Sequence, residues 1–157
     1  MTTYSRSRLR GYSHSTAREL EMLPETDRQE KVTLQECRYV AGKGRDGDGP
    51  ITVHFLDSDL ELTTTSLLGN GAFGKVYAAR SNGGTTYALK VSSNSMTEAD
   101  WRRLEEEVAV MKHFLRHPHI VKFVCAGKCE SMAFLVMERC VSKSLHDIIA
   151  TRDLSIE

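Results

Sequence analysis

The spacing of hydrophobic residues changes several times along the chain, and each change marks an expected structural element. Four segments in which apolar and polar residues alternate predict strands, at 51–55, 60–68, 76–79 and 87–91. Asp57-Ser-Asp59 and Gly83-Gly84 are turn sequences between them. Two apolar runs further along the chain predict two more strands, at 120–125 and 134–137.

Between the fourth and fifth of these segments, apolar residues recur every three or four positions, as on one face of a helix. The stripe consists of Trp101, Leu104, Val108, Met111 and Leu115. Ser95 followed by Glu98 predicts a capping box at its start, and His117-Pro118 predicts its end. A short second helix is expected from Ser144. Strands, one long helix and more strands indicate an α+β fold with a mainly antiparallel sheet.

Residues 1–50 are polar, show no sustained periodicity and end in a glycine-rich stretch. Such a segment buries too little apolar surface to offset its conformational entropy. We therefore expect a disordered, regulatory tail over 1–50 and a folded domain over 51–157. Arg8-Leu-Arg10-Gly-Tyr-Ser13 has the spacing of a basophilic phosphorylation site, which makes Ser13 a candidate. The alternative is a solvated, arginine-rich tail without that role.

Composition narrows the classes of function. The 21 basic and 21 acidic residues balance, so no overall field favours nucleic acid or a membrane surface. The longest apolar run, 132–137, is far shorter than the ~20 residues of a membrane-spanning helix. Four cysteines without a regular framework are typical of a reducing compartment, and we expect a cytoplasmic location. The first 18 residues are arginine-rich and free of acid, which leaves a mitochondrial presequence as the alternative.

A glycine-rich motif, Gly69-x-Gly71-x-x-Gly74, lies between the second and third predicted strands. A plain hairpin is one interpretation, since Asn70-Gly71 is a frequent turn pair. A dinucleotide-binding loop is excluded, because it needs a helix to begin within the motif, and residues 76–79 continue as a strand. The other interpretation is a strand–turn–strand flap whose backbone amides lie over phosphates, with Phe73 covering its tip.

Lys90 supplies a chemical partner for this flap. Ala88 and Lys90 face away from the side of their strand that carries Tyr87, Leu89 and Val91. Ala88 is small enough to leave room for a flat base, and Lys90 on the same face can reach the phosphates attached to it.

A lysine in a partly closed cleft needs a counter-charge, and the helix offers Glu105, Glu106 and Glu107. Glu107 projects from the apolar side of the helix, because Leu104 and Met111 lie three residues before it and four after it. We choose Glu107 as the partner of Lys90 and keep Glu106 as the alternative.

Together these elements resemble the small, ATP-binding lobe of eukaryotic protein kinases, most of all Ser/Thr kinases. The resemblance runs in unbroken order from about Thr63 to Ile149. Besides the glycine motif, Lys90 and the helix glutamate, it rests on Arg116-His-Pro-His-Ile-Val121 and Phe134-Leu-Val-Met-Glu-Arg-Cys140. It implies a twisted antiparallel sheet of about five strands with one long helix, and ATP as the cofactor.

The resemblance also implies roles for single residues. Lys90, paired to Glu107, would hold the α- and β-phosphates, and Met137 would be the gatekeeper beside the adenine. Backbone groups of the hinge (residues 138–140) would bond the adenine edge. The residues expected to contact the nucleotide are Leu68, Gly69, Asn70, Gly71, Ala72, Phe73, Gly74, Lys75, Val76, Ala88, Lys90, Met137, Glu138, Cys140 and Ser144.

Phosphoryl transfer in this family also uses a base-positioning Asp and metal-binding Asn and Asp residues. No Asp-Phe-Gly occurs in the 157 residues, and Asp153 follows the hinge too closely to be the catalytic Asp. Mg²⁺ is expected for the family, but we expect no ligands for it here and no transferase activity from this chain alone. The alternative is a non-catalytic module that binds nucleotide or docks on a kinase large lobe or a protein substrate.

Overall fold

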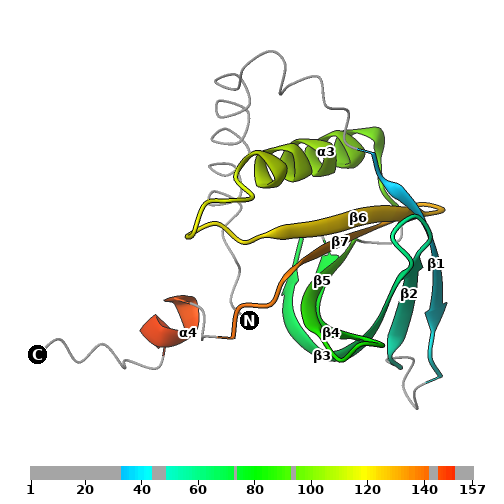
Figure 1. Cartoon of the computed structure of the whole chain (residues 1–157), viewed down its shortest axis with the longest axis horizontal. Helices are drawn as coiled ribbons and strands as arrows, with labels where there is room; N and C mark the ends of the chain where they lie inside the picture. Colours follow the sequence, from blue (N-terminus) through cyan, green and yellow to red (C-terminus); the bar gives the residue numbers. More distant parts are fainter. Residues whose placement is uncertain (1–32, 44–48, 73, 93–94, 142–144, 151–157) are drawn as a thin grey trace, which may run out of the picture.

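The computed structural model describes residues 33–43, 49–72, 74–92, 95–141 and 145–150 (Figure 1). Seven strands and two helices lie in these ranges. In chain order they are β1 (Gln35–Ala41), β2 (Ile51–Phe55), β3 (Leu60–Gly71), β4 (Gly74–Ser81), β5 (Thr86–Ser92), α3 (Glu98–His113), β6 (Phe123–Cys129), β7 (Met132–Glu138) and α4 (Leu145–Ala150). Neither of these helices is long and apolar enough to span a membrane.

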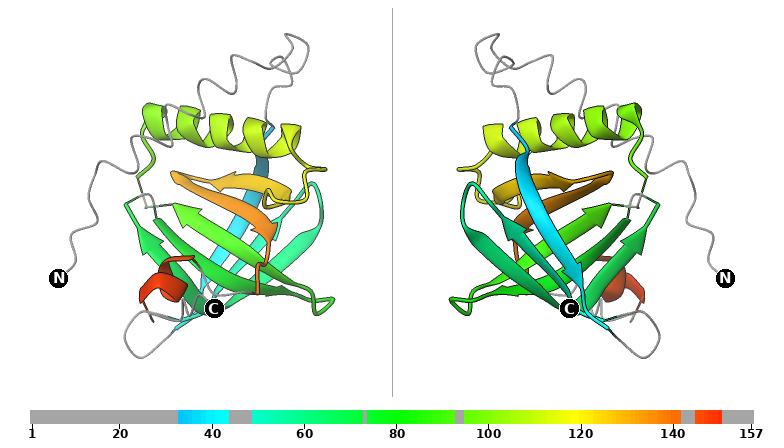
Figure 2. Two further views of the ribbon diagram at one scale, coloured as in Figure 1. Left: turned by 90° about the vertical axis from the view of Figure 1, so that its left-hand side faces the viewer. Right: turned by 90° about the vertical axis from the view of Figure 1, so that its right-hand side faces the viewer.

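The strands form a closed barrel in the order β1–β2–β3–β4–β5–β7–β6. Neighbouring strands are antiparallel except β1 and β6, which run parallel and close the barrel. α3 lies across the outside of β6 and β7, and α4 stands apart from the barrel (Figures 1 and 2). The expected sheet of about five strands is therefore corrected to seven strands, whereas the short helix expected after the last strand is confirmed as α4.

β1 accounts for much of this difference. Residues 35–41 belong to the segment for which the sequence predicts no stable structure, yet they pair with both β2 and β6. Cys37 is the one residue of β1 that is buried, so the strand shows no alternation that a pattern can reveal. The candidate phosphorylation site Ser13 and the rest of the expected tail up to residue 32 lie outside the described residues. The expected disorder is thus wrong for residues 35–41, whereas a regulatory role for the segment before residue 51 stays a prediction.

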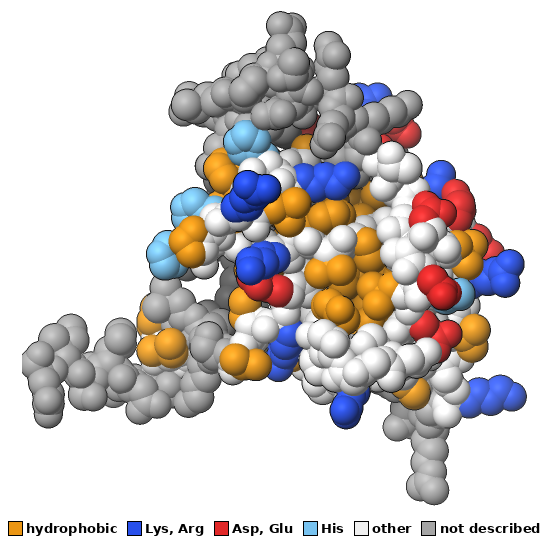
Figure 3. All heavy atoms as spheres, in the orientation of Figure 1, with side chains coloured by type: hydrophobic (Ala, Val, Ile, Leu, Met, Phe, Trp, Pro, Cys, Tyr) orange, Lys and Arg blue, Asp and Glu red, His pale blue; other side chains and the backbone are white. Residues whose placement is uncertain are grey.

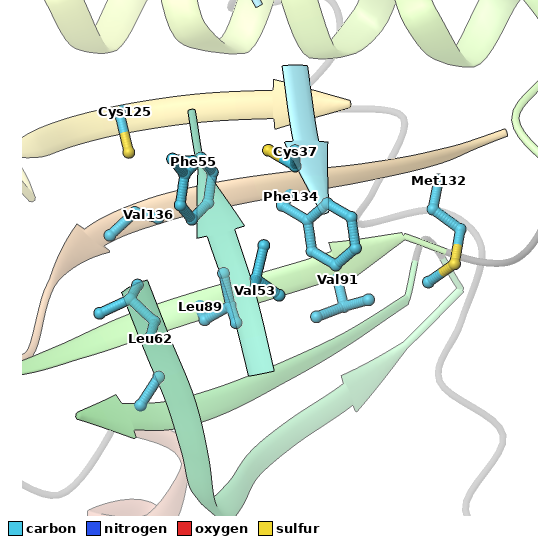
Figure 4. Packing of buried hydrophobic residues seen from close by; sticks show 11 residues of the cluster. Cys37, Val53, Phe55, Leu62, Leu89, Val91, Cys125, Met132, Phe134 and Val136 are labelled. Carbon is cyan, nitrogen blue, oxygen red and sulfur yellow. The ribbon is translucent and has the colours of Figure 1, made fainter. Parts of the chain in front are cut away.

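The interior of the barrel is one hydrophobic core, to which β2, β5 and β7 contribute alternate residues. Figure 4 shows these side chains converging on the middle of the barrel together with the thiols of Cys37 and Cys125. The largest side chains without exposed surface there are Phe55, Leu62, Leu89 and Phe134. In the space-filling view, hydrophobic side chains gather in the middle of the face of the molecule that is turned to the viewer, with charged side chains around them (Figure 3).

A second core holds α3 against the outside of the sheet. Leu104, Val108 and Met111 of the helix are buried there, together with sheet residues Ala126, Ala133 and Leu135. The predicted stripe is thus confirmed for its central three residues. Its last member, Leu115, lies beyond the end of the helix at His113 and is 41% exposed.

The start of α3 differs from the prediction by two residues. Thr97, not Ser95, is the N-cap, and it forms a capping box with Asp100. The Thr97 N–H donates to the Asp100 carboxylate at 3.0 Å, and the Asp100 N–H donates to Oγ1 of Thr97 at 3.3 Å. Hydrogen bonds from the Thr97 hydroxyl and backbone lower the pKa of Asp100. The box favours the charged form of Asp100, which also complements the helix dipole.

Gly127 allows β1 to approach β6. A Cβ atom at this position would overlap Sγ of Cys37, and it would lie 3.0 Å from the carbonyl oxygen of Gln35 and from Cδ1 of Phe55. These atoms belong to the barrel core and to the neighbouring strand backbone, where little space can open. A glycine is therefore needed where β1 closes the barrel.

We expect Gly127→Ala to lower the free energy of unfolding by about 1–3 kcal/mol, the usual cost of overpacking a core. Because the overlap is with Sγ of Cys37, that loss should be smaller in a Cys37→Ala background. Urea titrations of the parent chain, the two single variants and the double variant measure both free-energy losses. Gly83→Ala, in an open turn, is the control and should change stability by less than about 0.5 kcal/mol. Equal losses in the two glycine variants would contradict this account of Gly127.

Candidate functional site

Lys90 and Glu107 form an ion pair that joins the sheet to α3. Nζ of Lys90 donates to Oε2 of Glu107 at 3.0 Å and to Oε1 at 3.2 Å, so one ammonium group contacts both carboxylate oxygens. The two side chains are 28% and 41% exposed, respectively. The pairing chosen from the sequence is confirmed, whereas the catalytic role of the pair stays a prediction.

The positions of the two residues follow from the periods of their elements. Leu89 and Val91 of β5 point into the barrel, so Lys90 between them points outward. On α3, Glu107 precedes the buried Val108 and lies one turn after the buried Leu104, at the border of the face that packs on the sheet. Glu106, the alternative partner, is exposed. Lys90 therefore meets the glutamate at the edge of the buried stripe.

The glycine-rich motif forms the tip of the β3–β4 hairpin. Gly69 pairs with Val76, Asn70 with Lys75 and Gly71 with Gly74, so Asn70 and Gly71 belong to β3 and are not the turn pair. The strand–turn–strand form is confirmed, and contact with phosphates stays a prediction. Phe73, expected to cover the tip, lies outside the described residues.

The three glycines differ in what they require. Gly74 has a φ of 129°, and a Cβ there would overlap the carbonyl oxygen of Val91 in β5. Gly69 and Gly71 have nothing within 4 Å of where a Cβ would lie. Gly74 is thus needed by the fold, whereas the other two leave an open surface above the strands.

An apolar wall lies beside Lys90 on the outside of β4, β5 and β7. Ala88 is directly opposite Ala78 on one side and Met137 on the other, and Val76 is directly opposite Lys90. Residues paired in this way share one face of a sheet. Ala88 is buried, whereas Val76 and Met137 are partly exposed. The sheet therefore brings together small and aliphatic side chains next to an ammonium group. Leu68, expected to complete the wall from β3, is 40% exposed near a break in the β3–β4 register.

Two hydrogen bonds tie the start of the hinge to the segment before β6. The N–H of Glu138 donates to the carbonyl of Lys122 at 2.9 Å, and Oε1 of Glu138 accepts from the N–H of Lys122 at 3.0 Å. Only backbone contacts were expected of Glu138, and this bond of its side chain was not predicted. No local pattern could reveal this bond, because it joins residues that are 16 positions apart. Cys140 is exposed, and Ser144 lies outside the described residues.

The cysteines in the barrel act as apolar packing groups. Burial raises the pKa of Cys37 to about 12 and that of Cys125 to about 11, so both thiols keep their protons at neutral pH. Within the described ranges, no three His, Cys, Asp or Glu side chains are close enough together to hold a metal ion.

Comparisons with known proteins identify the class to which this fold and site belong. A family model described as "Protein kinase domain" matches residues 62–157, which is more than half of the chain. The chain therefore belongs to the protein kinase family. The match begins two residues into β3, so β1 and β2 precede it.

Curated relatives agree with this assignment. The chain is 37% identical over 82 residues to the "Probable serine/threonine-protein kinase zyg-1" of Caenorhabditis briggsae. It is 36% identical over 88 residues to "Calcium-dependent protein kinase 8" of Oryza sativa subsp. japonica. These alignments cover 52% and 54% of this chain but only 11% and 16% of the two relatives.

We expect Glu138→Ala to cost about 1 kcal/mol of stability, because it removes the acceptor of the Lys122 N–H. Glu138→Gln keeps a side-chain oxygen and should lose less. Urea unfolding gives the free energies, and hydrogen exchange of the Lys122 amide reports the bond itself. Glu106→Ala, which truncates an exposed carboxylate on α3, is the control. An unchanged exchange rate at Lys122 in Glu138→Ala would show that the side-chain bond contributes nothing.

Proposed function

We propose that residues 51–157 are the ATP-binding part of a protein kinase that phosphorylates Ser or Thr residues of proteins. The observation that carries this proposal is the Lys90–Glu107 pair beside the apolar wall of Val76, Ala88 and Met137. Membership of the kinase family supports it. We propose three things beyond family membership: the nucleotide that is bound, the acceptor residue, and the roles of the individual site residues.

The wall and the ammonium group suit two chemically different halves of ATP. Adenine is flat and apolar on its faces, and would lie against Val76 and Ala88, while hinge backbone groups at Glu138 and Cys140 would bond its edge. Lys90 would bind the α- and β-phosphates, with Glu107 keeping its ammonium in place. Backbone amides of the β3–β4 hairpin would cover the phosphates.

We expect the chain to bind a fluorescent ATP analogue in the presence of Mg²⁺, and Lys90→Ala to weaken this binding about 10- to 100-fold. A hydrogen bond to a charged group contributes about 1.5–3 kcal/mol, which corresponds to that range. Fluorescence anisotropy measures the affinity. Lys43→Ala, which truncates an exposed lysine of the described chain, is the control and should bind as the parent does.

Alkylation by iodoacetamide gives a second measure of the same binding. Bound ATP should slow the modification of Cys140 at the hinge and leave Cys129, at the far end of β6, unaffected. Binding by Lys90→Ala as tight as that of the parent, or equal protection of both cysteines, would contradict the proposed site.

We also propose that this chain of 157 residues transfers no phosphoryl group by itself. The family's base-positioning Asp and metal-binding Asn and Asp belong to motifs that include Asp-Phe-Gly, which is absent from this sequence. Mg²⁺ would then arrive with the nucleotide and find no protein ligands here. Transfer depends almost entirely on positioning and electrostatic stabilisation, so the expected loss is close to complete.

With radiolabelled ATP and a mixture of Ser/Thr protein substrates, we expect labelling by the parent chain to equal that by Lys90→Ala. The comparison matters because a contaminating kinase would label both samples alike. Labelling by the parent that disappears in Lys90→Ala would overturn the proposed inactivity.

A second candidate function is a non-catalytic module that docks on a kinase large lobe or on a protein substrate. The observation in its favour is exposed apolar surface after the hinge, where Val141 is 92% and Ile149 is 56% exposed. Figure 3 shows hydrophobic side chains on α4, to the left of the barrel. Apolar surface of this kind commonly marks a protein contact. A folded chain that binds no nucleotide would favour docking alone.

The cytoplasmic location and its mitochondrial alternative stay predictions.

A further inference from the structure

The start of β1 is where the N-terminal part of the barrel reaches α3. In Figure 1 this end of the strand lies close to α3. Leu34, the residue before β1, lines one hollow with Trp101 and Glu105 of α3 and Lys128 of β6. Leu34 and Trp101 are both partly buried against the core that holds α3 on the sheet.

We propose that Leu34, held in place by β1, is a positioning residue for Glu107. It fixes the first turns of α3 against β6 and thereby keeps Glu107 within hydrogen-bonding distance of Lys90. This inference rests on the proposed function, because the property that it adjusts is the affinity for nucleotide. It assigns a role to a segment that precedes the matched kinase region.

The barrel, and not α3, determines where Leu34 lies. Oε1 of Gln35 accepts hydrogen bonds from the N–H and the hydroxyl of Ser58, each at 3.0 Å. The carbonyl of Glu36 accepts from the N–H of Leu56 at 3.0 Å, and its carboxylate lies 3.5 Å from Nζ of Lys128. Leu34 therefore extends from a strand whose next two residues are tied to β6 and to the segment after β2.

Among the described sheet residues beneath α3, Leu135 is the one large side chain that is buried, and Phe123 and Met137 are partly buried. Two of the three sheet residues buried beneath the helix, Ala126 and Ala133, have small side chains. Leu34 adds a branched side chain at the end of the helix where Trp101 lies. Trp101 and Glu107 are less than two turns apart on one helix. Loosening the first turns of α3 therefore also loosens the position of Glu107.

The first test measures the seating of α3 without nucleotide. Trp101 is the sole tryptophan of the chain, so its fluorescence reports on the first turns of α3. We expect Leu34→Ala to shift its emission to longer wavelength and to increase its quenching by iodide. The matched control is Val40→Ala, which removes an aliphatic side chain from β1 that is 68% exposed. This control should leave both signals unchanged.

The second test separates positioning from a general loss of structure. Leu34→Ala should weaken binding of the ATP analogue about three- to tenfold, as expected if the paired arrangement falls to roughly a third or a tenth of the molecules. In a Glu107→Ala background the pair is already lost, so Leu34→Ala should weaken binding no further. Its effect on unfolding free energy should be the same in both backgrounds. Leu34→Met, which keeps the volume, should restore most of the affinity.

Two results would overturn the proposal: equal Trp101 shifts in Leu34→Ala and Val40→Ala, or an effect on binding that persists in the Glu107→Ala background. If Leu34→Ala does not fold, Leu34→Val makes a smaller truncation at the same contact and the same criteria apply. If the parent binds no analogue, the proposed function fails. Trp101 fluorescence then still decides whether Leu34 holds α3.

Discussion

β7 is buried along most of its length, and its two faces belong to two different cores. Met132, Phe134 and Val136 point into the barrel, whereas Ala133 and Leu135 lie beneath α3. A slip of one residue would exchange these two sets and place large side chains where alanine now fits. β7 also pairs with both β5 and β6, and it ends at the hinge. The positions of Lys90, α3 and the hinge relative to one another therefore depend on the register of this one strand.

Packing, and not the ion pair, decides where Glu107 lies. An ion pair between side chains that are 28% and 41% exposed contributes about 1 kcal/mol at most. Fully burying an aliphatic side chain contributes about 1.5–3 kcal/mol, and α3 buries Leu104, Val108 and Met111 against the sheet. The helix therefore settles where these three residues fit, and its period then brings Glu107 next to Lys90. The ion pair reports the position of α3 more than it determines it.

Features that depend on local periods could be predicted from the sequence, whereas features that depend on tertiary contacts could not. Strand alternation placed Lys90 on the outside of β5, and helix periodicity selected Glu107, because both periods are local properties of the chain. β1 was missed because one buried residue, Cys37, leaves no period to detect. The Glu138–Lys122 bond was missed because it depends on tertiary structure. The N-cap was misplaced at Ser95 because the chain contains two possible capping boxes, Ser95 with Glu98 and Thr97 with Asp100, and the second one forms.

β1 and β2, the two N-terminal strands, close the barrel. β3 to β7 pair among themselves and would leave β3 and β6 as free edges. β2 pairs with β3, and β1 pairs with both β2 and β6, so neither edge remains open. The contact between β1 and β6 requires close approach, which explains why the residue of β6 beneath Cys37 is Gly127. Because β6 also lies under α3, β1 restrains the strand on which the helix rests as well as contacting the helix through Leu34.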